Sequence, residues 1–208
     1  MKGMKRAKLL RIRQSPKLPA KTRRDQLLRA ARILFVKRGY RATTTEAIAC
    51  QAGLTKGALY FHFKSKEEIF GELIRQATDQ FAAAFDSDAV KGLSPGDVLK
   101  LLRKIDASRD MPRTRHSLHL RAEAVKLPRV RTHINSAIRR IIDIVADSLG
   151  SQFGRTRDQR RQMAMLTLAV YDGLSLGKQM SPDLLDMDQQ IGLFTALFSQ
   201  SKKRALRT

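Results

Sequence analysis

A single glycine, Gly53, stands between two short segments that each begin with the signals of a helix start. In the segment before it, TTTEAIACQAG, Thr43 or Thr44 can act as the N-cap, and Glu46 follows Thr43 at the spacing of a capping box. The segment after it begins at Thr55, only two residues later. Two short helices joined by such a tight glycine-containing turn form a helix-turn-helix, which strongly restricts the folds open to this chain.

Helical patterning continues on both sides of this unit. Residues 21–38 repeat apolar side chains at helical spacing, and Gly39 is expected to end that helix. Ser65 and Glu68 have the spacing of a second capping box, at the start of another helix. No segment alternates polar and apolar residues as a half-buried strand does, so we expect an all-α fold. The helices expected in the remainder span residues 95–108, 113–127, 129–150, 156–179 and 183–202.

The positive charge of the chain is concentrated near its N-terminal end. The whole chain has a net charge of +22, and residues 1–66 contain 18 Lys and Arg but only two acidic residues. A protein this basic is attracted to polyanions, which are nucleic acids or anionic membrane surfaces. Charge that served solubility alone would be spread evenly, so we expect the polyanion to bind the N-terminal third.

This distribution divides the chain into three expected regions. Residues 1–20 contain seven basic residues and no acid, and they are either a flexible basic arm that contacts the polyanion or an ordinary disordered tail. Residues 21–66 are expected to form a helix-turn-helix DNA-binding domain. Residues 67–208 are expected to form a separate helical domain.

The second helix of the helix-turn-helix carries side chains suited to reading DNA. A recognition helix enters the major groove with its N-terminal residues near the base edges, and here these are Thr55, Lys56 and Gly57. Lys56 can donate to O6 and N7 of guanine, and Gly57 leaves room for the backbone to approach the bases. Tyr60 and His62 can reach phosphates on the groove wall, or the tyrosine ring can contact a thymine methyl group.

Neighbouring helix ends can add contacts to the DNA backbone. Thr44 and Thr45 can present hydroxyl and backbone N–H groups to a phosphate, and Lys66 can add a charged contact. Phe63 falls at a helical spacing that places it in the core. Phe61 could face either the core or the DNA, and the spacing leaves both open.

The run GYRATTTEAIACQAGLTKGALYFHFKSKEEIF, residues 39–70, closely resembles the N-terminal DNA-binding segment of TetR-family transcriptional regulators. The helix expected at residues 21–38 extends the resemblance upstream, and beyond residue 80 the likeness is one of helical architecture alone. The positions that match DNA-contacting positions of the family are Thr45, Thr55, Lys56, Gly57, Tyr60, Phe61, His62 and Lys66.

The resemblance implies a homodimer that binds a palindromic operator in double-stranded DNA. It further implies a repressor that leaves the operator when a small-molecule effector binds the C-terminal domain, which would then serve both ligand binding and dimerisation. Three alternatives remain open. The chain could be a TetR-like activator, an architectural protein that binds nucleic acid without sequence preference, or a small-molecule binder or enzyme with a vestigial DNA domain.

Two apolar segments near the C-terminus could form the dimer interface. Residues 163–178 place small residues four apart, which lets two helices approach closely, and residues 191–198 add large apolar side chains. Pairing of both segments with their symmetry mates would give a four-helix interface, although both could instead be buried within one subunit. The interface candidates are Leu166, Ala169, Gly173, Gly177, Phe194 and Leu197.

A ligand pocket is harder to place from the sequence. The candidate lining residues are Met111, His116, His119, Leu120, Met163 and Tyr171. His116, His119 and Glu123 could share one helix face, because their spacings are three and four. No cysteine or carboxylate cluster completes a metal site there, so neither a metal nor a cofactor is expected.

Several other functional classes find no support in the sequence. There is no glycine-rich phosphate loop, nucleophile elbow or metal-ligand motif, so the chain is not expected to be an enzyme. One cysteine, Cys50, allows no disulfide within the chain and is typical of a reducing compartment. No apolar run reaches the roughly 18–20 residues of a membrane span, and the basic N-terminus lacks the apolar core of a secretory signal. We therefore expect a cytoplasmic protein.

Overall fold

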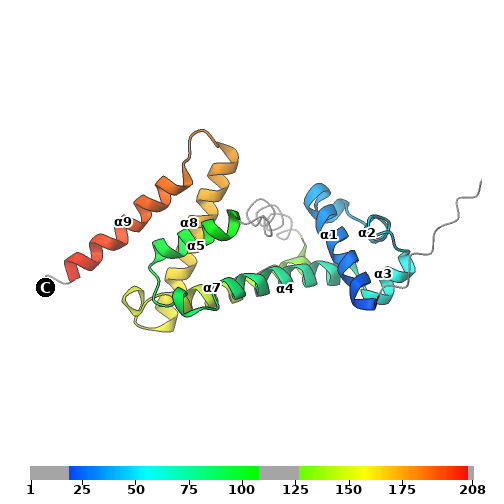
Figure 1. Cartoon of the computed structure of the whole chain (residues 1–208), viewed down its shortest axis with the longest axis horizontal. Coiled ribbons are helices and arrows are strands. Elements are labelled where there is room, and N and C mark those ends of the chain that lie inside the picture. Colours follow the sequence, from blue (N-terminus) through cyan, green and yellow to red (C-terminus); the bar gives the residue numbers. More distant parts are fainter. Residues whose placement is uncertain (1–18, 108–126, 206–208) are drawn as a thin grey trace, which may run out of the picture.

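The computed structural model of the chain describes residues 19–107 and 127–205 (Figure 1). Within these ranges every regular element is a helix, apart from one isolated β-bridge between Leu93 and Leu149. The predicted all-α fold is confirmed. Over the same residues, no helix combines the length and the apolar character needed to cross a bilayer.

Four helices form the N-terminal part of the fold and include the predicted helix-turn-helix (Figure 1). Gly39 interrupts the first of them with a φ of 79°, a left-handed conformation that suits glycine, and one more turn follows it. The predicted recognition helix begins at Lys56, with Thr55 as its N-cap. The observed bounds are α1 (Ala20–Ala42), α2 (Thr45–Gln51), α3 (Lys56–His62) and α4 (Lys66–Ala84).

The C-terminal part is also helical over the described residues. The observed elements are η1 (Asp88–Val90), α5 (Pro95–Ala107), α7 (Pro128–Ser148), η2 (Ser151–Phe153), α8 (Arg157–Met180) and α9 (Met187–Ala205). The helices expected at residues 95–108, 129–150 and 156–179 are confirmed to within two residues at each end. The helix expected at residues 113–127 lies almost entirely outside the described residues.

The last expected helix, residues 183–202, begins later than predicted, at Met187. The stretch SPDLLDMD contains three aspartates, any of which could cap a helix start. In the structure the Asp186 carboxylate accepts the backbone N–H groups of Asp188, at 2.9 Å, and Gln189, at 3.1 Å. This carboxylate therefore fixes the helix start, and the residues before it form a turn.

The core of the N-terminal part joins α1 to α4 through aromatic rings. Phe35 and Tyr40 of α1 meet Phe70 of α4, with ring centroids 5.2–5.8 Å apart. Val130 and Ile134, from α7, complete the same apolar cluster. The packing of the N-terminal helices thus continues beyond residue 66, and the predicted domain boundary at that residue stays a prediction.

The paired helices α4 and α7 run between the N-terminal helices and the C-terminal helices (Figure 1). Their far ends enter a second core, to which α4 contributes Phe81 and α7 contributes Val145. Near the first core, a Cβ atom added at Gly71 would lie 2.7 Å from the ring of His133. The absence of a side chain at Gly71 therefore lets α4 and α7 approach closely at this point.

The capping box predicted from Thr43 and Glu46 is wrong. Thr43 is fully buried and its hydroxyl donates to the carbonyl of Gly39, at 2.8 Å, so it serves the end of α1. Thr44 is the N-cap of α2, and its hydroxyl oxygen accepts the backbone N–H of Ala47 at 3.1 Å. Glu46 is thereby free to turn its carboxylate toward α3.

The capping box predicted for α4 is confirmed in part. The Ser65 hydroxyl accepts the backbone N–H of Glu68 at 3.2 Å, as expected. The Glu68 carboxylate reaches back one residue further than a standard box, to the backbone N–H of Lys64 at 2.6 Å. Both bonds satisfy N–H groups that lack a partner within the chain's helical ladder.

Removing the hydroxyl that caps α4 should weaken the whole N-terminal part. Ser65→Ala is expected to lower the free energy of unfolding by about 1 kcal/mol, measured by urea denaturation followed by circular dichroism. Ser87→Ala is the matched control, because Ser87 also precedes a helix but makes no capping bond with its side chain. Equal effects of the two substitutions would contradict a capping role for Ser65.

Candidate nucleic-acid interface

The recognition helix α3 has one face in the core and one face in solvent. Leu59 and Phe63 are essentially fully buried, which confirms the prediction that Phe63 belongs to the core. Lys56 and Tyr60 are exposed, and Phe61 is 82% exposed. The structure therefore resolves the choice left open for Phe61, whose ring lies on the outer face.

The turn before α3 determines how this face is presented. Gly53 has a φ of 68°, where any side chain would strain the backbone. Its N–H donates to the carbonyl of Cys50 at 3.0 Å, and the N–H of Leu54 donates to the carbonyl of Ala49 at 2.9 Å. These bonds close the end of α2 and let α3 begin within a few residues.

Four exposed side chains connect the start of α2 to α3, and we call them the α2–α3 polar cluster. They are Thr45, Glu46, Lys56 and Tyr60. The Lys56 ammonium forms an ion pair with the Glu46 carboxylate and lies 5.8 Å from the centre of the Tyr60 ring. The Thr45 hydroxyl donates to Glu46 at 3.2 Å, and the Tyr60 hydroxyl lies 3.3 Å from the Thr45 hydroxyl.

The charges of this cluster stabilise each other. The hydrogen bond from Lys56 is the main cause that lowers the pKa of Glu46 to about 2, and the backbone N–H groups of α2 act in the same direction. The same hydrogen bond raises the pKa of Lys56. Glu46 is therefore an anion, and Lys56 a cation, throughout the physiological pH range.

The other predicted DNA-contacting residues lie around this cluster. Thr44 and Thr55 cap α2 and α3, and each hydroxyl still has its hydrogen to donate. A Cβ atom added at Gly57 would meet only one protein atom, 3.9 Å away, so this position is open to an approaching ligand. His62 is half-buried and its ring lies edge-on to that of Phe61, with centroids 5.1 Å apart.

Lys66 is differently placed from the others. Its ammonium donates to the backbone carbonyls of Tyr40, at 2.9 Å, and Thr43, at 2.7 Å. It also lies 4.4 Å from the centre of the Tyr40 ring. Lys66 thus caps the end of α1 from the start of α4, and its contact with a phosphate stays a prediction.

The predicted ligand pocket draws on two parts of the chain. Met111, His116, His119 and Leu120 all lie outside the described residues. Among the others, Met163 is half-buried, and Tyr171 is buried and donates to the Asp106 carboxylate at 2.6 Å. Burial is the main cause that raises the pKa of Tyr171. Across residues 19–107 and 127–205, no group of three or more His, Cys, Asp and Glu could hold a metal ion.

The predicted interface residues divide between exposed and packed positions. Leu166, Ala169 and Gly173 form an exposed stripe along α8, and Leu197 is exposed on α9. Other large apolar side chains are exposed on the same two helices, namely Met165, Leu176, Met180 and Leu193. By contrast, Gly177 and Phe194 are half-buried and contact their own subunit.

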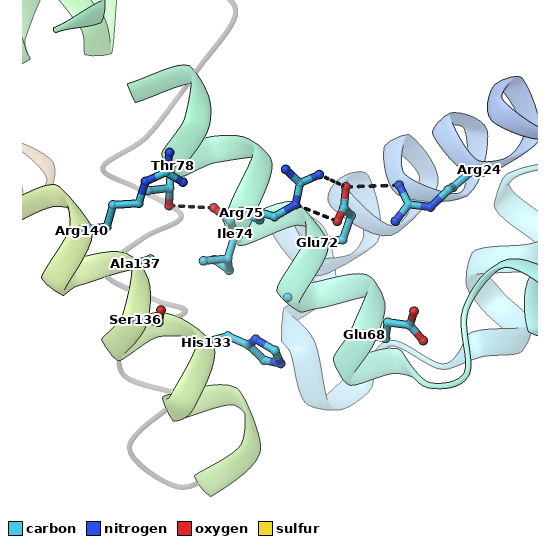
Figure 2. Close-up of a pocket in the computed structure, with 11 residues that line it drawn as sticks. Arg24, Glu68, Glu72, Ile74, Arg75, Thr78, His133, Ser136, Ala137 and Arg140 are labelled. Carbon is cyan, nitrogen blue, oxygen red and sulfur yellow. Dashed lines mark hydrogen bonds and ion pairs between the residues drawn. The ribbon is translucent and has the colours of Figure 1, made fainter. Parts of the chain in front are cut away.

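A groove that was not predicted lies between α1, α4 and α7. It has a volume of about 380 Å³, and Figure 2 shows side chains from all three helices around it. Its lining includes Arg24 of α1, Glu72 and Arg75 of α4, and His133 and Arg140 of α7. The groove therefore lies where the N-terminal helices meet the paired helices.

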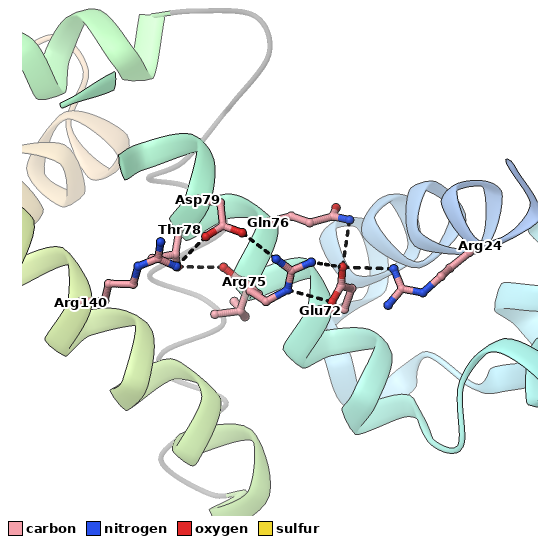
Figure 3. A network of polar contacts seen from close by, with 8 residues as sticks. Arg24, Glu72, Arg75, Gln76, Thr78, Asp79 and Arg140 are labelled. Carbon is pink, nitrogen blue, oxygen red and sulfur yellow. Dashed lines mark hydrogen bonds and ion pairs between the residues drawn. The ribbon is translucent and has the colours of Figure 1, made fainter. Parts of the chain in front are cut away.

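One wall of the groove is a chain of ion pairs (Figure 3). Glu72 accepts from Arg75 at 2.7 Å and from Arg24 at 3.2 Å. Asp79 continues the chain, since it accepts from Arg75 at 2.7 Å and from Arg140 at 2.6 Å. The spacing of Glu72, Arg75 and Asp79 by three and four is a signal that the sequence offered. The partners from α1 and α7 had no such signal.

Among the residues of these ion pairs, Glu72 should contribute most to the stability of the fold. Its hydrogen bond from Arg75 is the main cause that lowers its pKa to about 2. Glu72→Gln is expected to lower the free energy of unfolding at pH 7 by about 1 kcal/mol, measured by urea denaturation. Because the folded-state pKa lies below the ordinary value of 4.5, the difference between variant and wild type should shrink as the pH falls from 5 to 2.

The control for this experiment is Asp88→Asn, which removes a carboxylate paired with Lys91 on a fully exposed turn. It should leave the free energy of unfolding within about 0.5 kcal/mol of the wild type. A Glu72→Gln variant whose difference from wild type grew as the pH fell would contradict the role assigned to the ion pairs.

Comparisons with known proteins agree with this arrangement of helices. Residues 27–73 match the bacterial regulatory proteins of the tetR family. The transcriptional repressor KstR2 of Mycolicibacterium smegmatis is 48% identical over 65 residues, which cover 31% of this chain and 31% of KstR2. The transcriptional repressor Rv1474c of Mycobacterium tuberculosis is 27% identical over 168 residues, which cover 70% of this chain and 90% of that protein.

The chain matches less than a third of the length of KstR2. The fold of most of the chain also has a counterpart among solved structures. The transcriptional regulator FadR from Bacillus subtilis, solved in complex with stearoyl-CoA, aligns with a TM-score of 0.63 over 84% of this chain and 95% of its own, at 22% identity. The resemblance predicted from residues 39–70 is confirmed, and the N-terminal segment of residues 27–73 belongs to the tetR family of bacterial regulatory proteins.

Proposed function

We propose that this protein is a transcriptional regulator that binds an operator in double-stranded DNA as a homodimer. The observation that carries the proposal is the two-sided recognition helix. Leu59 and Phe63 anchor α3 in the core, while Lys56, Tyr60 and Phe61 extend into solvent. The outer face of this helix-turn-helix exposes an aromatic ring, a cation and a glycine with open space beside it. These groups are better placed to contact a DNA major groove than to remain exposed to water.

The proposed DNA contacts follow from this placement. Lys56 and Gly57 meet the base edges, and Tyr60, Phe61 and His62 meet the groove wall. Thr44, Thr45 and Thr55 offer hydroxyl groups to phosphates, and Lys66 adds a charged contact if it exchanges a carbonyl for a phosphate. The net charge of +16 over residues 1–66 favours this assignment. It attracts the protein to DNA of any sequence before contacts with particular bases form.

The proposed homodimer forms through the exposed apolar stripe of α8 and α9. Monomeric proteins rarely expose so many large apolar side chains on two neighbouring helices. A four-helix contact between two copies would cover Leu166, Ala169, Gly173 and Leu197. Two recognition helices in one dimer could then read half-sites one helical turn, about 34–36 Å, apart.

The proposed mode of regulation is release of a repressor by a small molecule. Residues 67–208 would hold the effector, and α4 and α7 would transmit its binding, because both helices belong to both cores. An effector that binds one spacing of the recognition helices better than another shifts the population toward that spacing. The proposal includes no catalytic step.

The deciding experiment is selection of DNA from a random pool by the full-length protein, followed by sequencing. A palindromic consensus with half-sites one helical turn apart is the expected result. A bound pool with no consensus would instead identify an architectural protein without sequence preference and would refute the proposal. A reporter gene placed behind the selected operator then decides between repression, which is expected, and activation.

A further inference from the structure

The outer face of the helix-turn-helix carries an acid where the proposed ligand is a polyanion. Residues 1–66 contain two acidic residues, of which Asp25 belongs to α1 and Glu46 belongs to α2. Glu46 is therefore the one carboxylate on the α2–α3 unit, whose residues the structure describes throughout. It is paired with Lys56, the side chain best placed to read a guanine.

Folding stability does not account for this ion pair. The side chains of Glu46 and Lys56 are 55% and 57% exposed. Exposed pairs contribute little to the stability of a fold, because water and salt screen both charges. The pair is therefore expected to affect how α3 contacts DNA.

We propose that Glu46 is a specificity-determining residue, which positions the Lys56 ammonium for a base and withholds it from phosphates. This inference rests on the proposed function. It follows from the donors of lysine, because an ammonium has three hydrogens and Glu46 engages only some of them. The remaining hydrogens can reach O6 and N7 of a guanine while the ion pair persists.

The same pair should weaken binding to DNA that lacks the operator. On such DNA a free lysine would swing to a phosphate, since its stem is flexible and the phosphate contact requires no particular base. The Glu46 carboxylate competes with the phosphate for the ammonium and repels the phosphate itself. Thr45 and Tyr60 hold the carboxylate side of the pair in place through the hydroxyl contacts of the α2–α3 polar cluster.

The test compares full-length wild type with Glu46→Gln on two duplexes of equal length, the selected operator and a scrambled sequence, at several salt concentrations. The variant should bind the scrambled duplex more tightly, by at least about threefold, and its dependence of log K on log salt should steepen by about one. Its affinity for the operator should change less, so the ratio of the two affinities falls.

Three further variants make the result specific, namely Asp88→Asn, Lys56→Gln, and Lys56→Gln combined with Glu46→Gln. Asp88→Asn removes the same charge from an exposed pair with Lys91, far along the chain, and should leave the affinity ratio unchanged. In a Lys56→Gln background, Glu46→Gln should lose most of its effect on the ratio, because Glu46 is inferred to act through Lys56. Circular dichroism should show the four variants to be as fully folded as the wild type.

Three outcomes would overturn the inference. An unchanged ratio in Glu46→Gln would show that the carboxylate has no part in discrimination. A full effect in the Lys56→Gln background would show that it does not act through Lys56. An altered preference for one base, with unchanged affinity for scrambled DNA, would make Glu46 a direct reader of that base. Wild-type protein without any operator preference would overturn the proposed function as well, which distinguishes the two failures.

Discussion

Replacing Phe70 by alanine should lower the free energy of unfolding by about 3–5 kcal/mol, a large share of the total stability of a domain. The Phe70 ring is 1% exposed and meets Phe35 and Tyr40 edge-on, at centroid distances of 5.8 and 5.2 Å. Its removal leaves a cavity at the junction of α1 and α4, because its ring packs between those two helices. Urea denaturation followed by circular dichroism measures the loss.

The DNA affinity of this variant should fall with its stability, because α3 depends on the same core for its position. Phe61→Ala is the matched control, since it removes an equal ring that is 82% exposed. That variant should keep the wild-type free energy of unfolding to within about 0.5 kcal/mol. Its affinity for the operator should nevertheless fall. A stability loss in Phe61→Ala as large as in Phe70→Ala would contradict the two-sided recognition helix.

Charging the apolar stripe of α8 and α9 should produce a monomer that binds the palindromic operator at least about 100-fold more weakly than the wild type. The double variant Leu166→Glu with Leu197→Glu places a carboxylate at two exposed apolar positions of the proposed interface. In the dimer these carboxylates would be buried without partners, which strongly disfavours association. Analytical ultracentrifugation measures the mass, and titration of the operator measures the affinity.

Ile33→Glu controls for the change in side-chain chemistry. Ile33 on α1 is 53% exposed and Leu166 is 54% exposed, so the two positions differ in place and not in burial. The control should remain dimeric. A double variant that stayed dimeric, with unchanged operator affinity, would exclude this stripe as the interface.

Sequence signals that depend on spacing along one helix predicted much of the fold. Ser65 and Glu68 lie within four residues of one another, and Phe63 belongs to a regular helical repeat, so local pattern was sufficient for both. The orientation of Phe61 follows from the same spacing once Leu59 and Phe63 are both placed in the core. At about 100° per residue, Phe61 lies about 200° around the helix from each of them, so their burial places its ring on the outer face.

Contacts between distant parts of the chain could not be predicted in this way. Arg24 and Glu72 are 48 residues apart, and Asp79 and Arg140 are 61 residues apart, so their meeting depends on how three helices cross. The wrong prediction of a capping box between Thr43 and Glu46 has a related cause. Thr43 matched the spacing of a cap, but its hydroxyl was taken by the end of α1, and this competition has no trace in a local pattern.

The helix α4 has a mechanical consequence that follows from its length. Its 19 residues make a rod about 28 Å long, with one end in each core. A rod of that length that tilts by about 5° about one end moves its other end by about 2–3 Å. A hydrogen bond is lost over a smaller displacement than this. A small rearrangement around Phe81 can therefore become a displacement of about 2–3 Å at the other end of α4, near α3. A displacement of that size would take α3 out of register with a major groove of DNA.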